Sequence, residues 1–452
     1  MQVIRGFTQA QQKMKRRIQE DWQLVPKNLR ESFAERFGEA MSPADAVARI
    51  LEEVRTNGDR AVRKYSLQLD GTEPTCLEVP QSDWEIAFQN TPTKLKEAMQ
   101  VAAKRIQSFH QASLPESWMD NIQGYGERFT PLERVGIYIP GGTAAYPSSV
   151  LMTAIPARVA GVNEIIITTP MSRGGPPDES VLAAAHIAGV DRVYQIGGAQ
   201  AIAAMAYGTE TITKVDMVCG PGGIFVTLAK RMVYGTVGVD GLYGPSETII
   251  IADKDADPVL CAADLLAQAE HDPLASPIII TTSEQFLANV MESVSIQLSQ
   301  LNRNQIARSA LDGQGTAIIV DTLEDAIALA NMYAPEHLCL SISNPWDWVD
   351  RVRNAGGVFI GSGSPEVLGD YVAGPSHVMP TGATARFSSP LGVHQFLKVT
   401  SLVGMHSDLV RELSEAGQII AEAEGLGAHA EAFRLRCMPA AEADSHPRKT
   451  VE

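Results

Sequence analysis

Short apolar segments alternate with segments of helical pattern over most of the chain, and this rhythm limits the folds that it can adopt. Strand-like segments of a first series lie at 134–139, 164–170, 192–196 and 214–219. Those of a second series lie at 248–252, 277–282, 317–320, 339–342 and 357–360. Strands joined through helices pair in parallel, because each helix carries the chain back to the same end of the sheet. The sequence therefore predicts two α/β units whose parallel sheets are covered by helices on both faces.

The remaining segments have a helical pattern and complete a division of the chain into domains. Residues 1–35 are predicted to form an N-terminal helical extension, and residues 391–452 a C-terminal helical tail. A first α/β domain is discontinuous and takes residues 36–133 and 247–390, and a second takes residues 134–246. The expected fold class is thus α/β, with two incomplete Rossmann-like parallel-sheet units plus helical N- and C-terminal extensions.

The charge, the cysteines and the apolar runs exclude several classes of protein. Asp and Glu outnumber Lys and Arg by 53 to 37, and a formal charge of −16 disfavours nucleic acid, whose phosphates need a basic surface. The five cysteines include no CxxC pair, which is typical of reduced thiols. No apolar run approaches the about 20 residues of a membrane helix, and no apolar core of a secretory signal follows the N-terminus. We therefore expect a cytoplasmic protein without nucleic-acid or membrane partners.

A glycine-rich turn at Gly220–Gly223 follows the fourth strand-like segment. Its spacing lacks the GxGxxG fingerprint, so a conventional Rossmann cofactor site does not follow from the sequence. A glycine turn after a strand can still bring backbone amides close to a phosphate. A tight left-handed turn explains the same glycines equally well.

Gln268 and His271 lie near the end of a helix predicted over 256–271. They are three residues apart and share one helix face with Asp264, one turn earlier. Nitrogen and oxygen donors on adjacent turns suit zinc. The alternative is a helix end at which the imidazole stabilises the helix dipole.

Two further segments carry acid–base candidates at boundaries between elements. Glu336 and His337 stand side by side before a strand-like segment, and a glycine-rich loop holds Asp370 and His377. A glutamate can activate water, and a histidine titrates near neutrality. Surface charge remains the alternative for the pair, and an Asx-type turn remains the alternative for the loop.

Three more polar residues give weaker signals. Ser246, at the opening of the second series, could bond a ligand or cap a turn. Glu424 and His429 are five residues apart, which separates them by about 140° around a helix. They share a face only if the backbone at Gly425 or Gly427 breaks the helix.

Eight phrases of the sequence look like those of the histidinol dehydrogenase family. They lie in order at 134–142, 196–202, 244–247, 268–271, 334–337, 369–371, 376–381 and 428–429. The resemblance covers nearly the whole chain and is specific, because independent motifs occur at the spacings of the family. The family oxidises an amino alcohol to the amino acid histidine.

The resemblance implies a role for each matching residue. One Zn²⁺ per subunit would be held by Gln268, His271, Asp370 and His429. Besides these ligands, the substrate L-histidinol would contact Ser246, His337, His377 and Glu424. NAD would bind to the domain of residues 134–246, at positions that correspond to Tyr138, Gln200 and Gly223. Gly223 departs from the family, which usually has an Asn there, and this weakens one expected contact with NAD.

The resemblance also implies a mechanism and an assembly. The expected reaction is the NAD-dependent, zinc-assisted four-electron oxidation of L-histidinol via L-histidinal to L-histidine, in the last steps of histidine biosynthesis. His337 would accept the alcohol proton, and Glu336 would activate the water that attacks the bound aldehyde. Zinc would anchor and orient the substrate. Family members are homodimers with a domain-swapped tail, so Glu424 and His429 would come from the partner subunit.

Three other functions fit parts of the same pattern. A paralogous zinc- and NAD-dependent dehydrogenase could oxidise another small polyol, such as a sulfonated diol. A zinc hydrolase could use the same donors and a nearby glutamate, but it would not depend on NAD. A non-catalytic metal-binding scaffold would have no need of the Glu336–His337 pair beside its metal.

Overall fold

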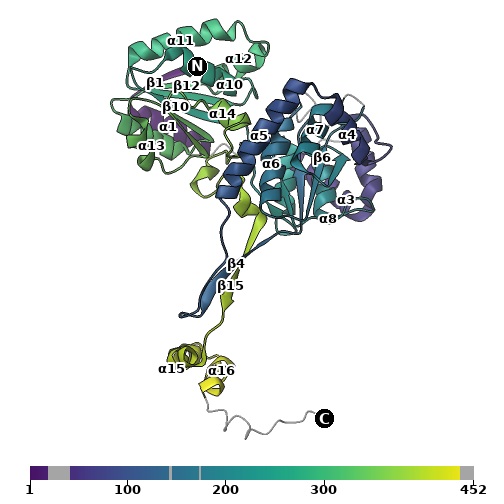
Figure 1. Cartoon of the computed structure of the whole chain (residues 1–452). Helices are drawn as coiled ribbons and strands as arrows, with labels where there is room; N and C mark the ends of the chain where they lie inside the picture. The colour runs from purple at the N-terminus through teal and green to yellow at the C-terminus, as the bar shows by residue number, and fades with distance from the viewer. Residues whose placement is uncertain (19–40, 142–144, 173–174, 438–452) are drawn as a thin grey trace. The chain divides into compact units, whose positions relative to one another are not determined.

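The computed structural model describes residues 1–18, 41–141, 145–172 and 175–437 (Figure 1). The chain divides into two compact units. The first comprises Met1–Leu114 and Pro131–Phe396, and the second comprises Pro115–Thr130 and Leu397–Glu452. In the described ranges, no helix has the length and apolar character needed to cross a bilayer.

One six-stranded sheet of the first unit, here called the β10 sheet, is parallel throughout. Its strand order is β1-β12-β11-β10-β13-β14. The strands are β1 (Gln2–Arg5), β10 (Glu247–Ala252), β11 (Ser276–Thr281), β12 (Thr316–Ile319), β13 (His337–Ser341) and β14 (Gly357–Ile360). Without β1, the order along the sheet is third, second, first, fourth and fifth, as in the Rossmann fold without its last strand.

Helices cover both faces of the β10 sheet, as its uniformly apolar strands predict. Ile250 and Ala252 pack on one side with α10 (Pro258–Ala269), α11 (Glu284–Leu298) and α12 (Asn304–Gly313). Ile249 and Ile251 point to the other side, where α1 (Phe7–Ile18) and α13 (Leu323–Tyr333) pack. Adjacent residues of one strand face opposite sides, so an all-apolar strand needs both layers.

The second sheet of this unit, here called the β5 sheet, repeats the same order. It runs β2-β7-β6-β5-β8-β9, and only β2 is antiparallel to its neighbour among the pairs that the structure describes. Its strands are β2 (Glu78–Val79), β5 (Arg134–Tyr138), β6 (Glu164–Thr169), β7 (Arg192–Gln195), β8 (Met217–Cys219) and β9 (Gly238–Val239). The prediction of an α/β fold with two incomplete Rossmann-like sheets is confirmed.

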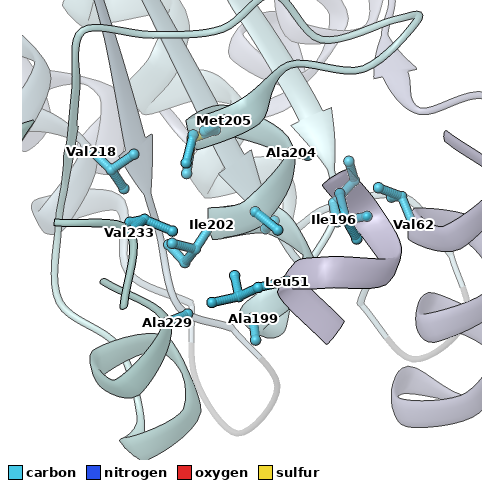
Figure 2. Close-up of a cluster of buried hydrophobic side chains, with 14 of the residues drawn as sticks. Leu51, Val62, Ile196, Ala199, Ile202, Ala204, Met205, Val218, Ala229 and Val233 are labelled. Atoms are coloured by element: carbon cyan, nitrogen blue, oxygen red, sulfur yellow. The ribbon is translucent and has the colours of Figure 1, made fainter. Parts of the chain in front are cut away.

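The described helices between residues 43 and 112 pack on the side of the β5 sheet. They are α3 (Pro43–Tyr65), with η1 (Ser66–Asp70) after it, α4 (Gln81–Asn90) and α5 (Thr93–Ala112). They contact α6 (Pro147–Val159), α7 (Glu179–Ala188), α8 (Gly198–Tyr207) and α9 (Ile224–Val233). Figure 2 shows Leu51 and Val62 of α3 in one buried cluster with Ile202 and Ala204 of α8.

Two predicted domain boundaries differ from this arrangement. Residues 36–133 were expected to join 247–390, but their described helices pack on the β5 sheet and β2 pairs with β7. The periodicity of α3 identifies its apolar face but not the sheet that this face covers. The N-terminal extension begins with a strand, β1, which pairs with β12, and its residues 19–35 lie outside the described residues.

The second unit contains a small sheet and two helices. The sheet has the order β15-β4-β3, from β3 (Trp118–Asp120), β4 (Tyr125–Pro131) and β15 (Leu397–Val403). The helices are α15 (Ser407–Ala423) and α16 (Gly427–Cys437). The C-terminal region, predicted as a mostly helical tail, also contributes a strand, since β15 pairs with β4, far away in the sequence. Gly425, with φ of 74°, breaks the helix between α15 and α16, one of the two positions at which a break was considered.

Candidate active site

The amino ends of β10 and β13 carry the acid–base pair found in the sequence. α13 ends at Tyr333 and is capped by Ala334, whose φ of 55° is left-handed, and Pro335 cannot extend the helix. Glu336 and His337 follow at the start of β13, and His337 lies opposite Thr248 of β10. Their exposed fractions are 8% and 2%, so the alternative of surface charge is wrong.

The backbone of Glu247 fixes both members of this pair. Its N–H donates to Glu336 Oε2 at 3.0 Å, and its carbonyl oxygen lies 3.2 Å from His337 Nδ1. The contact with a carbonyl requires a proton on Nδ1. His337 Nε2 is therefore the ring atom that can take up a proton, and Asp370 Oδ1 lies 3.5 Å from it. Phe359 stacks against the imidazole with ring centroids 5.7 Å apart.

Burial and nearby charge shift the pKa values of this pair. Burial raises the pKa of Glu336 to about 8, against the opposing charge of His337. Burial alone would lower the pKa of His337, but the carboxylates of Glu336, Asp370 and Glu366 outweigh it and raise that pKa. A base surrounded by carboxylates holds a proton more readily than an ordinary histidine.

Asp370, on α14 (Glu366–Tyr371), gathers three other predicted site residues around it. Gln268 Nε2 donates to Asp370 Oδ2 at 3.4 Å, and His377 Nδ1 lies 2.7 Å from the Asp370 carbonyl oxygen. The charge of His271 is within electrostatic reach of Asp370. Burial raises the pKa of Asp370, but the three imidazoles, His337 first, outweigh it and leave the pKa lowered. Asp370, predicted in a loop, thus lies near the end of the short helix α14 and places a charged carboxylate among imidazoles.

The position of His271 differs from its predicted place on a helix. α10 ends at Ala269, and His271 lies beyond it in a turn in which its N–H donates to the Gln268 carbonyl at 3.3 Å. Its side chain is exposed, while Gln268 is only 1% exposed. The amide oxygen of Gln268, an imidazole nitrogen of His271 and the carboxylate of Asp370 form a set of donors that suits zinc.

Sequence reasoning missed two carboxylates at this site. Glu366 is fully buried and accepts a hydrogen bond from Thr248 Oγ1 at 2.7 Å, and burial raises its pKa to about 7. Glu247 Oε1 accepts from the Gly382 N–H at 2.7 Å. Glu366 lies in the first turn of α14, where a glutamate is ordinary, and Glu247 occurs in the phrase 244–247 but was given no role of its own. Ser246, the predicted neighbour of substrate, precedes β10 at this same edge.

The predicted cofactor residues lie at the carboxyl ends of the β5 sheet, away from the acid–base pair along the chain. Tyr138 ends β5, and its hydroxyl accepts the Gly198 N–H at 3.1 Å. Gln200 is fully buried and donates to Asp70 Oδ2 at 3.3 Å, while its Oε1 has no hydrogen-bond partner among the described residues. Gly223 is the N-cap of α9. The crevice between the first and fourth strands is where such folds bind nucleotides.

A carboxylate lies at the carboxyl end of β10, the position in the β10 sheet that corresponds to the end of β5. Asp253 directly follows β10, and its Oδ2 accepts the Ser343 N–H, beyond the end of β13, at 2.6 Å. The residues for chemistry lie at the opposite, amino ends of these strands. The predicted site residues of the two sheets thus lie at opposite strand ends.

Glu424 and His429 belong to the second unit. Glu424 caps the end of α15, His429 lies in α16, and both side chains are exposed. Among the described residues, no group of three or more His, Cys, Asp or Glu side chains could hold a metal ion. The candidate ligands of the first unit include only two such residues, His271 and Asp370, beside the amide of Gln268.

Two Rossmann-like parallel sheets with a buried acid–base pair at the amino ends of one of them are typical of an α/β enzyme. The family model for histidinol dehydrogenase matches residues 35–437. A histidinol dehydrogenase from Dehalococcoides mccartyi is 46% identical over 96% of this chain and 100% of its own length. One from Thermus thermophilus is 48% identical over 90% of this chain and 98% of its own length. The chain belongs to the histidinol dehydrogenase family.

A solved structure agrees with this assignment. The crystal structure of histidinol dehydrogenase from Elizabethkingia anophelis has a TM-score of 0.89 and 35% sequence identity to this chain. The match covers 96% of this chain and 98% of the other. The likeness therefore extends over both units of the chain.

Proposed function

We propose that this chain catalyses the NAD-dependent, zinc-assisted oxidation of L-histidinol via L-histidinal to L-histidine. Membership of the family and the matching residues support the substrate and the reaction. The observation that carries the proposal is the buried Glu336–His337 pair beside Gln268, His271 and Asp370. A base, a second carboxyl group and donors for a metal lie at one edge of one sheet.

Each member of the pair has one task. His337 Nε2 accepts the proton of the alcohol in the first oxidation, with Nδ1 held by the Glu247 carbonyl. Glu336 accepts a proton from the water that adds to the aldehyde carbon, and the resulting diol is oxidised in the second step. NAD, when bound, supplies the oxidising power by taking one hydride from carbon in each oxidation. Ser246, His377 and Glu424 would contact the substrate.

Four residues would hold one zinc ion per subunit: Gln268, His271, Asp370 and His429. The ion would supply a positive charge that anchors and orients the amino alcohol. The neutral amide, the carboxylate and the two imidazoles give a mixed nitrogen and oxygen set that is usual for this metal.

Replacing His271 by Asn tests this ligand set. We expect bound zinc to fall well below one per subunit and turnover to fall by at least about 100-fold, because one of few metal ligands is lost. Zinc is measured by atomic absorption after gel filtration. His394→Asn, at an exposed histidine outside the site, is the control. Retained zinc with full activity would remove His271 from the ligand set.

NAD would bind at the carboxyl ends of the β5 sheet, near Tyr138, Gln200 and Gly223. Gly223 has a φ of −66°, and a Cβ added there meets no atom within 4 Å. An asparagine fits this N-cap without strain and is preferred there over glycine.

The Gly223→Asn substitution is therefore expected to lower the KM for NAD. One added hydrogen bond of about 0.7 kcal/mol corresponds to about a threefold decrease. The KM is measured with L-histidinol at saturation. Gly313→Asn, at the end of α12 and also in open space, is the control for a general effect on stability. An unchanged KM would place NAD away from this cap.

The protein is proposed to act as a homodimer in which Glu424 and His429 of the partner subunit complete the site. The second unit supports this, because its exposed side chains include many large apolar ones: Ile122, Val399, Val403, Ile419, Ile420 and Leu426. Apolar surface on this scale is typical of a surface that a partner covers.

A cytoplasmic location is proposed because the five cysteines are free thiols, which is typical of a reducing compartment.

The deciding experiment counts NADH formed per L-histidinol consumed by the zinc-loaded protein. We expect two NADH per substrate, lost on chelation and restored by zinc. No NADH from L-histidinol, but turnover of another small polyol, would move the substrate to a paralogous dehydrogenase.

A further inference from the structure

A buried ion pair lies beneath the glycine turn of the β5 sheet, and the proposed chemistry does not use it. Lys230 of α9 is 1% exposed, and its Nζ lies 2.5 Å from Asp240 Oδ1, in a side chain with no exposed surface. A buried ion pair is no more stabilising, as a rule, than well-packed apolar side chains of the same volume. Stability alone therefore does not explain the Lys230–Asp240 pair, and the groups that it contacts indicate its role.

The ion pair holds both peptide groups of a single residue. Lys230 Nζ donates to the Gly220 carbonyl at 2.9 Å, and the Gly220 N–H donates to Asp240 Oδ2 at 2.9 Å. Gly220 has a φ of 101°, and a Cβ there would meet the Tyr138 carbonyl oxygen at 2.2 Å. The Lys230–Asp240 pair, here called the clamp, therefore fixes the start of the Gly220–Gly223 turn against the end of β5, at the proposed NAD site.

The Asp240 carboxylate also contacts Tyr243, in the segment that leads to the amino end of β10, here called the substrate edge because the proposed catalytic residues lie there. Tyr243 donates its hydroxyl to Asp240 Oδ2 at 3.0 Å, and its ring centroid lies 4.6 Å from Lys230 Nζ. The Tyr243 carbonyl accepts from Thr227 Oγ1 of α9 at 3.0 Å. The next residue, Gly244, donates to Thr381 Oγ1 at 2.6 Å, just before Ser246 and β10.

We propose that Lys230 and Asp240 are positioning residues, which hold the nucleotide-binding turn in shape and, through Tyr243, couple it to the substrate edge of β10. Binding of the dinucleotide and of the amino alcohol then assist each other, because each orders the same 240–246 segment. This inference rests on the proposed function, since it takes the crevice at Tyr138 and Gly220 as the NAD position.

The test measures NADH binding by fluorescence, with and without L-histidinol. NADH cannot reduce an alcohol, so both ligands bind without turnover. The main variant combines Lys230→Met with Asp240→Asn, which avoids leaving one buried charge unpaired. Its Kd for NADH should rise by at least about tenfold, as expected from the loss of a charged hydrogen bond that orders the turn. The effect of L-histidinol on that Kd should disappear.

Two further variants separate positioning from general stability. Tyr243→Phe removes one hydroxyl and keeps the packing; we expect it to weaken the coupling and to raise the Kd for NADH by about threefold. Arg134→Met with Glu164→Gln removes the ion pairs that Glu164 makes with Arg134 and Arg192 at the amino ends of the β5 sheet, and should change neither quantity. Thermal melts establish that each variant is folded.

Unchanged NADH affinity and unchanged coupling in both the double variant and Tyr243→Phe would overturn the inference. Equal weakening in the Arg134 and Glu164 control would do the same, because the effect would then be one of stability. A wild-type protein that binds NADH but oxidises no L-histidinol would instead overturn the proposed substrate, and the NADH affinities of the variants would still decide the role of the clamp.

Discussion

Glu336→Gln is expected to slow oxidation of L-histidinal by roughly 10²–10⁴-fold, the usual contribution of a general base, and to change oxidation of L-histidinol much less. The amide oxygen of glutamine can still accept the Glu247 N–H, so the geometry is kept. It cannot accept a proton from water, which only the second oxidation requires. Burial, which already raises the pKa of this carboxyl group to about 8, makes it a stronger base than an exposed glutamate.

The two half-reactions are followed separately by stopped-flow measurement of NADH, starting from the alcohol or from the aldehyde. Asp253→Asn is a matched control, since this carboxylate also accepts a backbone N–H but lies at the other end of β10. Equal loss in both half-reactions would contradict the role of Glu336 as activator of water and would favour a structural role.

Mixing two inactive variants is expected to restore activity if the tail is exchanged between subunits. His271→Asn damages the first unit, and His429→Asn damages the second unit. In a mixed dimer with exchanged tails, one site carries both substitutions and the other carries neither. Random mixing of equal amounts should therefore recover about a quarter of the wild-type activity, because about half of the dimers are mixed and each has one intact site.

The variants are unfolded and refolded together, or co-expressed with different tags, and zinc is supplied during assembly. Each variant refolded alone is the control for residual activity. A mixture that stays as inactive as its components would show that each chain completes its own site, and Glu424 and His429 would then act in cis.

The central strands of both sheets could be predicted because each is a short apolar run between helical patterns, as at Ile165–Ile167 and Ile249–Ile251. The two-residue edge strands β2 and β9 are too short to give such a signal. β1 could not, because its Gln2–Arg5 stretch has no such pattern and gains its place only by pairing with β12. The sheet that a helix covers is likewise fixed by long-range packing, which explains the wrong grouping of residues 36–133.

The site shows the same limit. Glu336 and His337 stood out as an adjacent acid and base, but only the fold shows that the pair is buried. Gln268 and Asp370 are far apart in the sequence, and their contact depends on α10 and α14 meeting beside β13. Glu366 was missed for a similar reason, since its burial against Thr248 comes from tertiary packing.

The carboxylate of Asp253 has a consequence for the order of events in the proposed reaction. It follows β10 at the carboxyl end of the sheet, the end that carries the proposed NAD site in the β5 sheet, and a negative charge there would repel a pyrophosphate. The proposed function then places one dinucleotide at a time on each chain, at the β5 sheet. Two hydride transfers at one binding site require NADH to dissociate and a second NAD to bind between them. The aldehyde must be retained throughout this exchange, so a reactive intermediate stays sheltered while its oxidant is replaced.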